Sequence, residues 1–575
     1  MAAGILFSNG RVVDVVGKRI VRKDVMVKDG KICLSFSPDD ADEVIDLKGA
    51  YISPGFIDGH IHIESSMLTP LEFAYEAVRH GTTSVFVDPH EIANVLGRKG
   101  IDLFLDQAGL VPFTMNIGIP SCVPATGMET AGGVISVEDI EELLKDERVY
   151  GLAEMMNFPG IVYGLGDARG KVRLALKAGK IADGHAPGLS GSDLALYISN
   201  GELDGEVRIS SDHECTHPAE AVEKWEKGMY IMLRHGSAAK DLENILPEVC
   251  REVLNLENFG LVSDDLSAAD LRSRGHMNYL VNKAAAIIEK ERGCDAESAV
   301  IEAISMATVN HARHFRKNTG VIEEGASGDI VVFDSLSDIK PSIVLSRGRV
   351  VARDGKYTGD RAAYDYTGYR HPVKVPALKE NILAVKSDNL SEKVRVIGVK
   401  AGSLLTEEII EVMPVRHGEV SPPPENGITK VAVLERHKGT GNIAVGFVKG
   451  FDFAGGAIAS TVAHDSHNLI VAGKDARSML KAINRVKEEG GGLAAVFNGK
   501  EEALPLKLGG LMSLEDINKV LEHHEKLDAL IKEMGFKTDP FATLSFLALP
   551  VIPKLKITDE GLVDVEQFDF VNLFV

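Results

Sequence analysis

The sequence predicts an α/β protein built on a (β/α)8, TIM-like barrel, with a split β-sandwich from both flanks and an additional C-terminal α+β domain. Three observations indicate this architecture. Between residues 51 and 318, strand-like apolar runs alternate with segments of helical periodicity. Short strands with tight turns lie on both sides of this region. After residue 370 the alternation stops and a different pattern begins. A chain of 575 residues is long enough for several domains of this kind.

The two flanks, residues 1–50 and 319–369, are rich in short strands and hairpin turns. The turn signals are Asn9-Gly10, Asp29-Gly30, Arg347-Gly348 and Asp354-Gly355. Each flank is too small to form a stable hydrophobic core alone. We therefore expect the flanks to combine into one composite β-sandwich.

The central region, residues 51–318, contains eight candidate strands. They are Tyr51–Ile57, Thr83–Asp88, Phe113–Ile117, Val149–Glu154, Lys180–His185, Glu206–Asp212, Met229–Arg234 and Phe259–Asp264. Eight strands with connecting helices over this length match a (β/α)8 barrel. A doubly wound open sheet is the alternative, but it would not place reactive side chains at the ends of so many strands.

The C-terminal region, residues 370–575, is expected to be a separate α+β domain. Arg370–Pro376 has the composition of a linker, and Val394–Lys400 and Thr429–Arg436 have strand patterns. Helical periodicity covers Asp475–Glu489 and ends at a run of three glycines. A second helical segment covers Glu515–Met534.

Composition and charge exclude several classes of partner. The formal charge is 63 − 84 = −21, which argues against binding to nucleic acid or to anionic membranes. Five scattered cysteines form no CxxC pair and suit a reducing compartment. The N-terminus has no secretory signal pattern, and no stretch of about 18 apolar residues occurs. We expect a cytoplasmic protein.

The most informative motif is His60-Ile61-His62, which follows the first apolar run of the central region. On extended backbone, alternate side chains lie on one face, so both imidazoles can point at one metal ion. Two histidines at this spacing also occur by chance, and a polar strand end is the alternative interpretation. The other strand ends decide between the two.

Reactive side chains stand at or just past the ends of five of the eight candidate strands. They are His60 and His62, Glu154, His185, His213 and Asp264. Active sites of these barrels lie at the carboxyl ends of the strands, where such residues converge. Four imidazoles and two carboxylates suffice for two divalent ions, with Glu154 able to bridge them. A single histidine or aspartate would more often be structural, but six together indicate a metal centre.

The pattern resembles the amidohydrolase superfamily, including its split β-sandwich. More narrowly, Pro54–Met67, Val87–Asn94 and Gly184–Ser190 resemble the bacterial and archaeal adenine deaminases, as do Gly455–Ala459 and His464–Asn468 in the C-terminal region. The likeness extends over essentially the whole chain. Many superfamily members bridge their metals with a carboxylated lysine, so Glu154 argues against cyclic-amide hydrolysis.

The resemblance implies hydrolysis of adenine to hypoxanthine and ammonia, in purine salvage, by attack of a metal-bridged hydroxide on C6. We assign His60, His62 and Asp264 to one ion and His185 and His213 to the other. Asp264 would accept the proton of the attacking water and pass it to the departing ammonia. The expected catalytic residues are Asp264, Glu91 and His213. Glu91 is the first candidate for the acid that protonates the purine ring; a solvated glutamate at a helix N-terminus is the alternative.

The expected substrate-binding residues are Glu64, Ser65, Ser66, His90 and Glu91. The first three directly follow the paired histidines and could hydrogen-bond a purine edge, or could cap the next helix instead.

Other polar residues are expected to lie outside the reacting centre. Asp212 and Asp265 are expected to orient ligands. His464 and His467 are expected to lie in a polar loop rather than to bind metal, and such a loop could also cover the barrel mouth as a lid. Three isolated histidines are expected to be structural or on the surface, namely His235, His276 and His311.

Imidazole and carboxylate ligands do not select one metal, and the resemblance implies manganese or iron, with zinc as an alternative. Two other functions stay open: a binuclear amidohydrolase acting on another aminopurine or a cyclic amide, and a catalytically silent scaffold. We expect a homo-oligomer, a dimer or larger.

Overall fold

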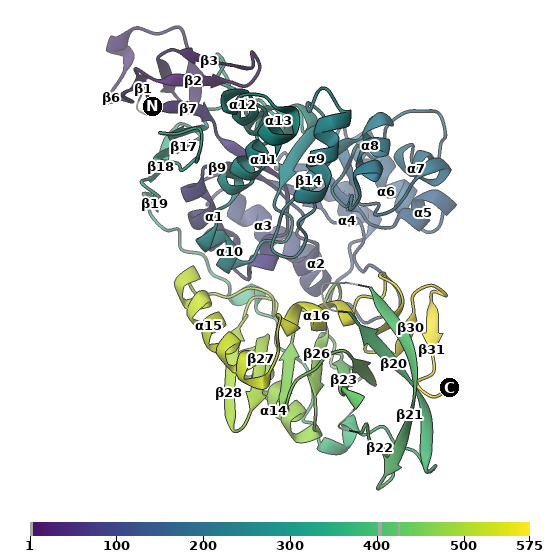
Figure 1. Ribbon diagram of the computed structural model, residues 1–575. Helices are drawn as coiled ribbons and strands as arrows, with labels where there is room; N and C mark the ends of the chain where they lie inside the picture. Colours follow the sequence, from purple (N-terminus) through teal and green to yellow (C-terminus); the bar gives the residue numbers. More distant parts are fainter. Residues whose placement is uncertain (1–3, 401–404, 424–425) are drawn as a thin grey trace.

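The computed structural model describes residues 4–400, 405–423 and 426–575. Figure 1 shows three parts: a β-rich part that contains the N-terminus, a central part of strands and helices, and a C-terminal part packed beneath it. None of the helices in these described ranges is long and apolar enough to cross a lipid bilayer.

The two flanks of the chain form the β-rich part, as expected. One sheet has the order β5-β4-β1-β6, and the other has the order β19-β18-β17-β16-β7-β2-β3. The strands are β1 Ile5–Ser8, β2 Arg11–Asp14, β3 Arg19–Arg22, β4 Val25–Lys28, β5 Lys31–Cys33, β6 Glu43–Asp46, β7 Tyr51–Pro54, β16 Ile330–Phe333, β17 Ile343–Ser346, β18 Arg349–Arg353 and β19 Lys356–Tyr357. Buried apolar side chains from both flanks share one core, among them Phe7, Val25, Ile330 and Leu345.

Eight parallel strands form the central barrel. They are β8 Phe56–Ile61, β9 Thr82–Val87, β10 Thr114–Ile119, β11 Val149–Met155, β12 Ile181–Gly184, β13 Ser211–Asp212, β14 Tyr230–Arg234 and β15 Phe259–Val262. Strands β8 to β12 form one ladder and β13 to β15 another. The Ser210 N–H donates to the Ala182 carbonyl at 2.9 Å, and Ile61 forms a parallel bridge with Asp264, so the ring closes on both sides. The expected fold class is confirmed.

Helices surround the strands, as Figure 1 shows. They are α1 Pro70–Ala77, α2 His90–Leu96, α3 Arg98–Ala108, α4 Val137–Leu143, α5 Phe158–Tyr163, α6 Ala168–Lys177, α7 Gly191–Ile198, α8 Pro218–Glu226, α9 Leu242–Glu252, α10 Ala268–Ser273, α11 Met277–Arg292, α12 Ala296–Met306 and α13 Val309–His314. Several begin at a side-chain cap of the kind that satisfies free backbone N–H groups, such as Ser136 before α4. This arrangement turns the carboxyl ends of all eight strands toward one side of the barrel.

Two predicted strands differ from the structure. The apolar run Tyr51–Ile57 is two strands, because β7 pairs with β2 and β16 in the sandwich and β8 begins the barrel. The chain changes sheets at Gly55, where a Cβ would lie 2.1 Å from the Thr83 hydroxyl oxygen. The sixth strand, expected over Glu206–Asp212, is only β13; the glycines at 201 and 205, both with positive φ, make the preceding segment a loop.

The C-terminal part is an α+β unit, as expected. Its described residues form a sheet of the order β22-β21-β20-β24-β23-β26-β25-β27-β28 and a small sheet β29-β30-β31. The strands are β20 Ser391–Val399, β21 Thr406–Arg416, β22 Glu419–Val420, β23 Ile428–Leu434, β24 Ile443–Lys449, β25 Ala457–Ser460, β26 Leu469–Gly473, β27 Gly492–Phe497, β28 Lys500–Pro505, β29 Leu555–Ile557, β30 Leu562–Asp564 and β31 Asp569–Val571. The helices are α14 Ala476–Glu489, α15 Ile517–Met534 and α16 Pro540–Leu547.

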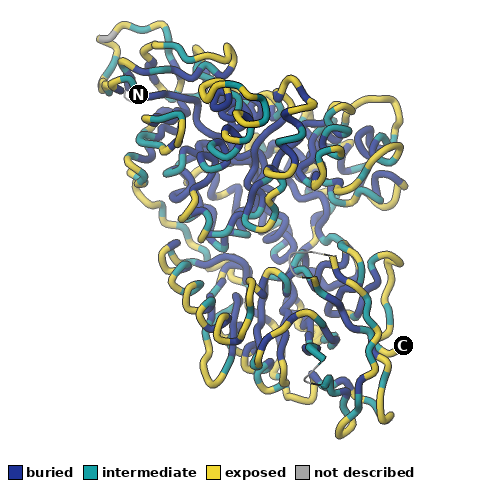
Figure 2. The backbone as a smooth tube through the Cα atoms, viewed as in Figure 1, coloured by how far each residue is buried: buried dark blue, intermediate teal, exposed yellow. Residues whose placement is uncertain are grey.

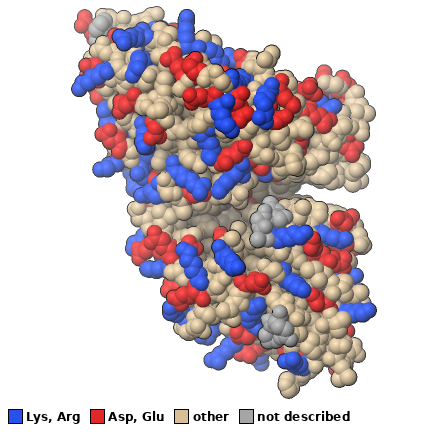
Figure 3. Space-filling view, in the orientation of Figure 1, with Lys and Arg blue, Asp and Glu red and all other residues tan. Residues whose placement is uncertain are grey.

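The segment expected to be a linker, Arg370–Pro376, is packed rather than free. Val373 and Val375 are buried in the core of the C-terminal part, and the Lys374 N–H donates to the Arg436 carbonyl at 2.9 Å. Figure 2 shows continuous buried chain inside both the barrel and the C-terminal sheet. The surface is hollowed between these two parts, and acidic and basic side chains are intermixed on the face seen in Figure 3.

Candidate metal centre and active site

The six side chains expected to hold metal come together at the carboxyl ends of the barrel strands. His60 lies near the end of β8, and His62 follows it; Glu154 lies in the last part of β11. The other three, His185, His213 and Asp264, directly follow or closely follow β12, β13 and β15. Five of the six are buried, and His185 is partly exposed.

Three of these side chains form one group. The Nε2 atoms of His60 and His62 are 3.1 Å apart. Asp264 Oδ1 lies 3.6 Å from the first of these nitrogens and 3.3 Å from the second. Asp264 has a φ of 55°, a left-handed conformation that is unusual for aspartate and that aims its carboxylate at the histidines.

Glu154 connects this group to the remaining two histidines. Its Oε2 lies 2.6 Å from His185 Nδ1 and 3.1 Å from His213 Nε2, while its Oε1 lies 3.7 Å from His62 Nε2. The His213 ring stacks on His60 with 3.9 Å between ring centroids. The two carboxylate oxygens therefore face two sets of ligands, as a bridging carboxylate requires.

The chemistry of these donors fits divalent metal. The His62 Nδ1–H donates to the Asp88 backbone carbonyl at 3.0 Å, so the neutral ring presents a lone pair at Nε2. Burial, followed by His213 and His62, holds the pKa of His60 well below its ordinary value, which keeps that imidazole neutral. Lone pairs and carboxylate oxygens that face one another in a buried site can be satisfied by a cation between them. The same atoms form compact groups able to hold an ion.

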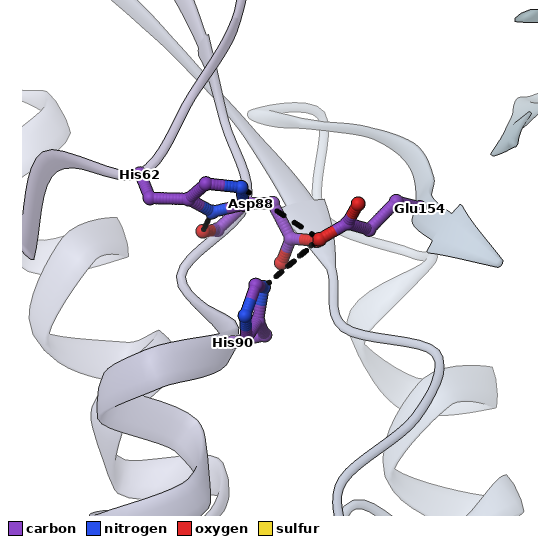
Figure 4. A group of neighbouring side chains, drawn as sticks. All are labelled: His62, Asp88, His90 and Glu154. Atoms are coloured by element: carbon purple, nitrogen blue, oxygen red, sulfur yellow. Dashed lines mark hydrogen bonds and ion pairs between the residues drawn. The ribbon is translucent and has the colours of Figure 1, made fainter. Parts of the chain in front are cut away.

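Two further residues at this centre, Asp88 and His90, follow β9. Figure 4 shows that His62 and His90 both point toward Glu154. His90 Nδ1 lies 3.2 Å from Glu154 Oε1 and 3.4 Å from Asp88 Oδ2. His90 was expected to contact substrate, and in the structure it lies against the Glu154 carboxylate. Asp88 was not singled out by the sequence, although it ends a predicted strand and that position could have indicated it.

Arg234 and Glu214 complete the rim of the centre, and neither was predicted from the sequence. Arg234, at the end of β14, forms an ion pair with Glu214 and places Nη1 3.2 Å from Asp264 Oδ2. Glu214 Oε1 lies 3.4 Å from His213 Nε2. The guanidinium thus holds two carboxylates that face metal-ligand positions. Arg234 ends a predicted strand and Glu214 lies two residues past the end of another, which is the signal that could have found them.

A buried ion pair ties the second group of ligands together. Asp212 accepts the backbone N–H of Ala186 at 2.8 Å and that of Glu214 at 3.2 Å, next to His185 and His213 respectively. Lys224 of α8 donates to Asp212 at 3.0 Å and to the Ala186 carbonyl at 2.6 Å. Burial raises the pKa of Asp212, but Lys224 and His213 outweigh burial and lower it to about 2. This agrees with the expectation that Asp212 orients ligands.

We expect the substitution Lys224→Met to lower the free energy of unfolding by about 3–5 kcal/mol, because it leaves a buried carboxylate unpaired. Urea unfolding would measure this change. Lys227→Met, three residues further along at the surface, should change stability by less than about 1 kcal/mol. Equal effects of both substitutions would contradict the role given to this ion pair.

The segment after the paired histidines, Ile63–Ser66, is a 3-10 turn that lines the site. Glu64 Oε1 accepts the N–H of Ile92 in the first turn of α2, at 3.2 Å, whereas its Oε2 is buried without a hydrogen-bond partner. The Ser65 hydroxyl donates to Asp265, which directly follows Asp264. The Ser66 hydroxyl donates to the Ile63 carbonyl within the same turn, at 2.6 Å, so we leave Ser66 out of the substrate site.

Glu91, in the first turn of α2, meets the C-terminal part rather than solvent. Its Oε1 lies 2.5 Å from His464 Nδ1, and its Oε2 contacts His467 Nε2. The two histidines lie in the loop between β25 and β26, as expected, and this loop reaches the barrel. They lie 373 or more residues along the chain from Glu91, and no local pattern indicates such a contact.

The isolated histidines are structural, as expected for His276 and His311. His276 Nε2 lies 2.9 Å from Asp58 Oδ2, and His311 Nε2 donates to the Leu261 carbonyl at 2.8 Å. His235 is buried beside Tyr279, away from the six metal-ligand candidates.

Comparison with known proteins places this geometry in a family. Residues 51–356 match the family model "Amidohydrolase family", and residues 403–569 match "Adenine deaminase C-terminal domain". The chain is 41% identical to the adenine deaminase of Desulfatibacillum aliphaticivorans, over 99% of this chain and 97% of that protein. It is 42% identical to the adenine deaminase of Methanothermobacter thermautotrophicus, over 98% of this chain and 99% of that protein.

The chain belongs to the adenine deaminase family of amidohydrolases. The similarity covers the sandwich, the barrel and the C-terminal part alike, so the third part is a regular component of this family and not an unrelated addition. The amidohydrolase family is metal-dependent, and the buried histidines and carboxylates described above are groups able to bind metal. The protein is thus a hydrolase of a metal-dependent family, with groups able to bind metal at the barrel mouth.

Proposed function

We propose that this protein hydrolyses adenine to hypoxanthine and ammonia, as a step of purine salvage. The observation that carries the proposal is the set of six candidate ligands, five of them buried, with Glu154 between two groups, in a chain similar over its whole length to adenine deaminases. An unmodified glutamate at the bridging position also separates this site from those built on carboxylated lysine.

The site would hold two divalent ions, manganese or iron, with zinc as an alternative. His60, His62 and Asp264 would hold one ion and His185 and His213 the other, with Glu154 shared. The ions, when bound, would lower the pKa of water toward neutrality and so supply the nucleophile.

Asp264 is the proposed proton acceptor from the attacking water. Its Oδ1 faces His60 and His62, and its Oδ2 is held by Arg234, so the carboxylate has a fixed direction. The attacking oxygen would add to C6 of adenine while Asp264 takes its proton, and Asp264 would return this proton to the departing ammonia. His213, stacked on His60, would keep the two ligand groups next to each other.

The purine would lie between the ligands and the loops that cover them. Glu64, Ser65, His90 and Glu91 offer polar atoms at this side, and the second oxygen of Glu64 is buried without a hydrogen-bond partner. Such an atom favours a ligand that brings a donor, such as a purine N–H or amino group.

We expect the purified protein, loaded with Mn²⁺, to release ammonia from adenine and to shift the ultraviolet absorbance of the base. Removal of the ions by a chelator should abolish turnover, and Mn²⁺ should restore it. Turnover of hydantoin or dihydroorotate with none of adenine would favour a cyclic-amide hydrolase. Turnover of another aminopurine, with none of adenine, would indicate a deaminase of the same mechanism with a different substrate.

Metal analysis separates an enzyme from a silent scaffold. We expect close to two ions per chain, whereas less than about one tightly held ion would favour the scaffold.

We also propose that the protein works in the cytoplasm as a homo-oligomer. Its free cysteines support a reducing compartment, and its net charge of −21 supports a small-molecule substrate. Light scattering would measure the assembly.

A further inference from the structure

One loop of the C-terminal part extends over the mouth of the barrel. It connects β25 with β26 and contains His464, Asp465 and His467. His464 and His467 contact Glu91, and the Asn468 side chain donates to the Thr130 carbonyl of a barrel loop at 2.9 Å. The C-terminal part thus supplies residues to the same site as the barrel.

The hydrogen bonds of His467 fix where its proton lies. His467 Nδ1 accepts the backbone N–H of Ala463 at 3.1 Å, so this nitrogen carries a lone pair. Burial lowers the pKa of His467 to about 4, so the ring is neutral and its one N–H is at Nε2. That N–H donates to Glu91. His467 therefore has no lone pair left for a metal, and Glu91, His464 and His467 form a hydrogen-bonded unit rather than a third cation site.

His464 is the exposed member of this unit. Its side chain is 17% exposed, against 1% for His467. Nδ1 faces Glu91, the ring stacks on Phe546 of α16 with 4.9 Å between centroids, and the backbone N–H donates to the Ser545 hydroxyl at 3.1 Å. A carboxylate that holds Nδ1 orients the imidazole and directs Nε2 away from that carboxylate.

The residues around His464 belong to both sides of the site. Glu91 follows His90, which contacts the bridging Glu154. Asp265, on the other side, follows Asp264 and contacts Ser65. Both acidic groups, together with Asp465, interact electrostatically with the His464 ring. The ring therefore lies close to two acidic residues of the barrel, Glu91 at the start of α2 and Asp265 after β15.

We propose that Nε2–H of His464 donates the proton that a purine ring nitrogen takes up when water adds to C6, with Glu91 and His467 holding the imidazole in place. This rests on the proposed adenine deamination and names a catalytic residue for it from the C-terminal part.

The protonation states of the unit support this assignment. Burial lowers the pKa of His464, but Glu91, Asp265 and Asp465 outweigh burial and raise it to about 9, so the ring carries a proton to give at neutral pH. Burial raises the pKa of Glu91, but His464, His467 and His90 outweigh it and hold the pKa well below its ordinary value. Glu91 is thus ionised and orients the acid, and the prediction that Glu91 itself is the acid does not fit.

The step is balanced in protons and electrons. The water oxygen forms a bond to C6, the C6–N1 π pair moves to the ring nitrogen, and that nitrogen takes the His464 proton. The C6–amino bond then breaks as ammonia leaves with the proton that Asp264 returns. The remaining hydroxyl proton is released on formation of the C6 carbonyl and, through solvent, restores His464. One water is consumed, and hypoxanthine and ammonia are formed.

The test compares His464→Ala with the wild-type protein, both loaded with Mn²⁺. We expect kcat for adenine to fall about 10²–10³-fold with metal content unchanged, and added imidazole to restore part of the loss. Wild-type activity should fall as pH rises past about 9, where His464 loses its proton, and the variant should lack this fall. His523→Ala, on the surface of α15, is the matched control and should keep wild-type activity.

Two results would overturn the inference: activity of His464→Ala within about threefold of wild type, or a loss that imidazole does not restore and that leaves the pH profile unchanged. If the alanine variant does not fold, His464→Gln replaces it, because glutamine fills the space but donates no proton in acid catalysis. Full activity of His464→Gln overturns the inference. A large loss of its activity with a normal unfolding temperature supports the inference. Absence of adenine turnover by the wild-type protein would instead reject the proposed function.

Discussion

Asp264→Asn is expected to lower kcat for adenine by about 10³-fold or more, because an amide cannot accept the proton of the attacking water. The substitution preserves the size of the side chain and one oxygen. Arg234 keeps its ion pairs with Glu214 and Asp241, so the loop should hold its position. Stopped or steady-state assays of ammonia release, with metal content measured on the same samples, would check the result.

The matched control is Asp270→Asn, the same change in α10, which starts a few residues after Asp264. It should reduce activity less than about twofold. If the Asp264→Asn variant lost its bound ions together with its activity, the loss of activity would show that Asp264 binds metal and would not test proton transfer. Near-normal turnover with full metal content would reject Asp264 as the base.

Glu154→Gln is expected to reduce the bound metal from two ions to one or fewer and to reduce adenine turnover by at least about 10²-fold. One carboxylate oxygen faces His62 and His90, and the other faces His185 and His213. An amide replaces one oxygen by an NH2 group, which cannot bind a cation. Bridging is therefore lost although the shape is kept.

Thermal unfolding gives a second measurement of the same change. Ions that bind only the folded protein stabilise it, so Mn²⁺ should raise the unfolding temperature of the wild-type protein and raise that of Glu154→Gln much less. Glu138→Gln, at the start of α4, is the control and should respond to Mn²⁺ as the wild-type protein does. Two ions retained by Glu154→Gln would show that this residue does not bridge.

The barrel and its six metal-ligand candidates could be predicted because the relevant signals are local. Apolar runs, helical periodicity and the turn signals each depend on neighbouring residues. In a parallel barrel, all strands end on one face, so a polar residue at the end of any strand is placed at that face by the fold class alone. Position along the chain thus converts directly into position in space for His60, Glu154 and His213.

Local signals were not enough where two sheets compete for one segment. Tyr51–Ile57 is a single apolar run, and only its pairing with β2 and β16 on one side and β9 on the other divides it at Gly55. The partners are up to about 280 residues away, as for β16, and the run itself contains no charge that marks the boundary.

The contacts of individual side chains were also beyond local pattern. Ser65 and Ser66 carry the same hydroxyl group. The 3-10 turn directs that of Ser66 to the Ile63 carbonyl and that of Ser65 to Asp265. His90 and Glu91 are adjacent, yet the start of α2 points one toward Glu154 and the other toward the C-terminal part.

The sequence by itself thus determined the fold class, the residues able to hold metal and the family, because strand ends, spacing and motifs are properties of contiguous residues. Only the tertiary structure decided what closes the site. Glu91 lies in the barrel and His464 in another part of the chain, and packing of the two parts joins them. Since burial and neighbouring charge set the protonation of both groups, the distinction between an acid and the carboxylate that orients it exists only in the folded protein.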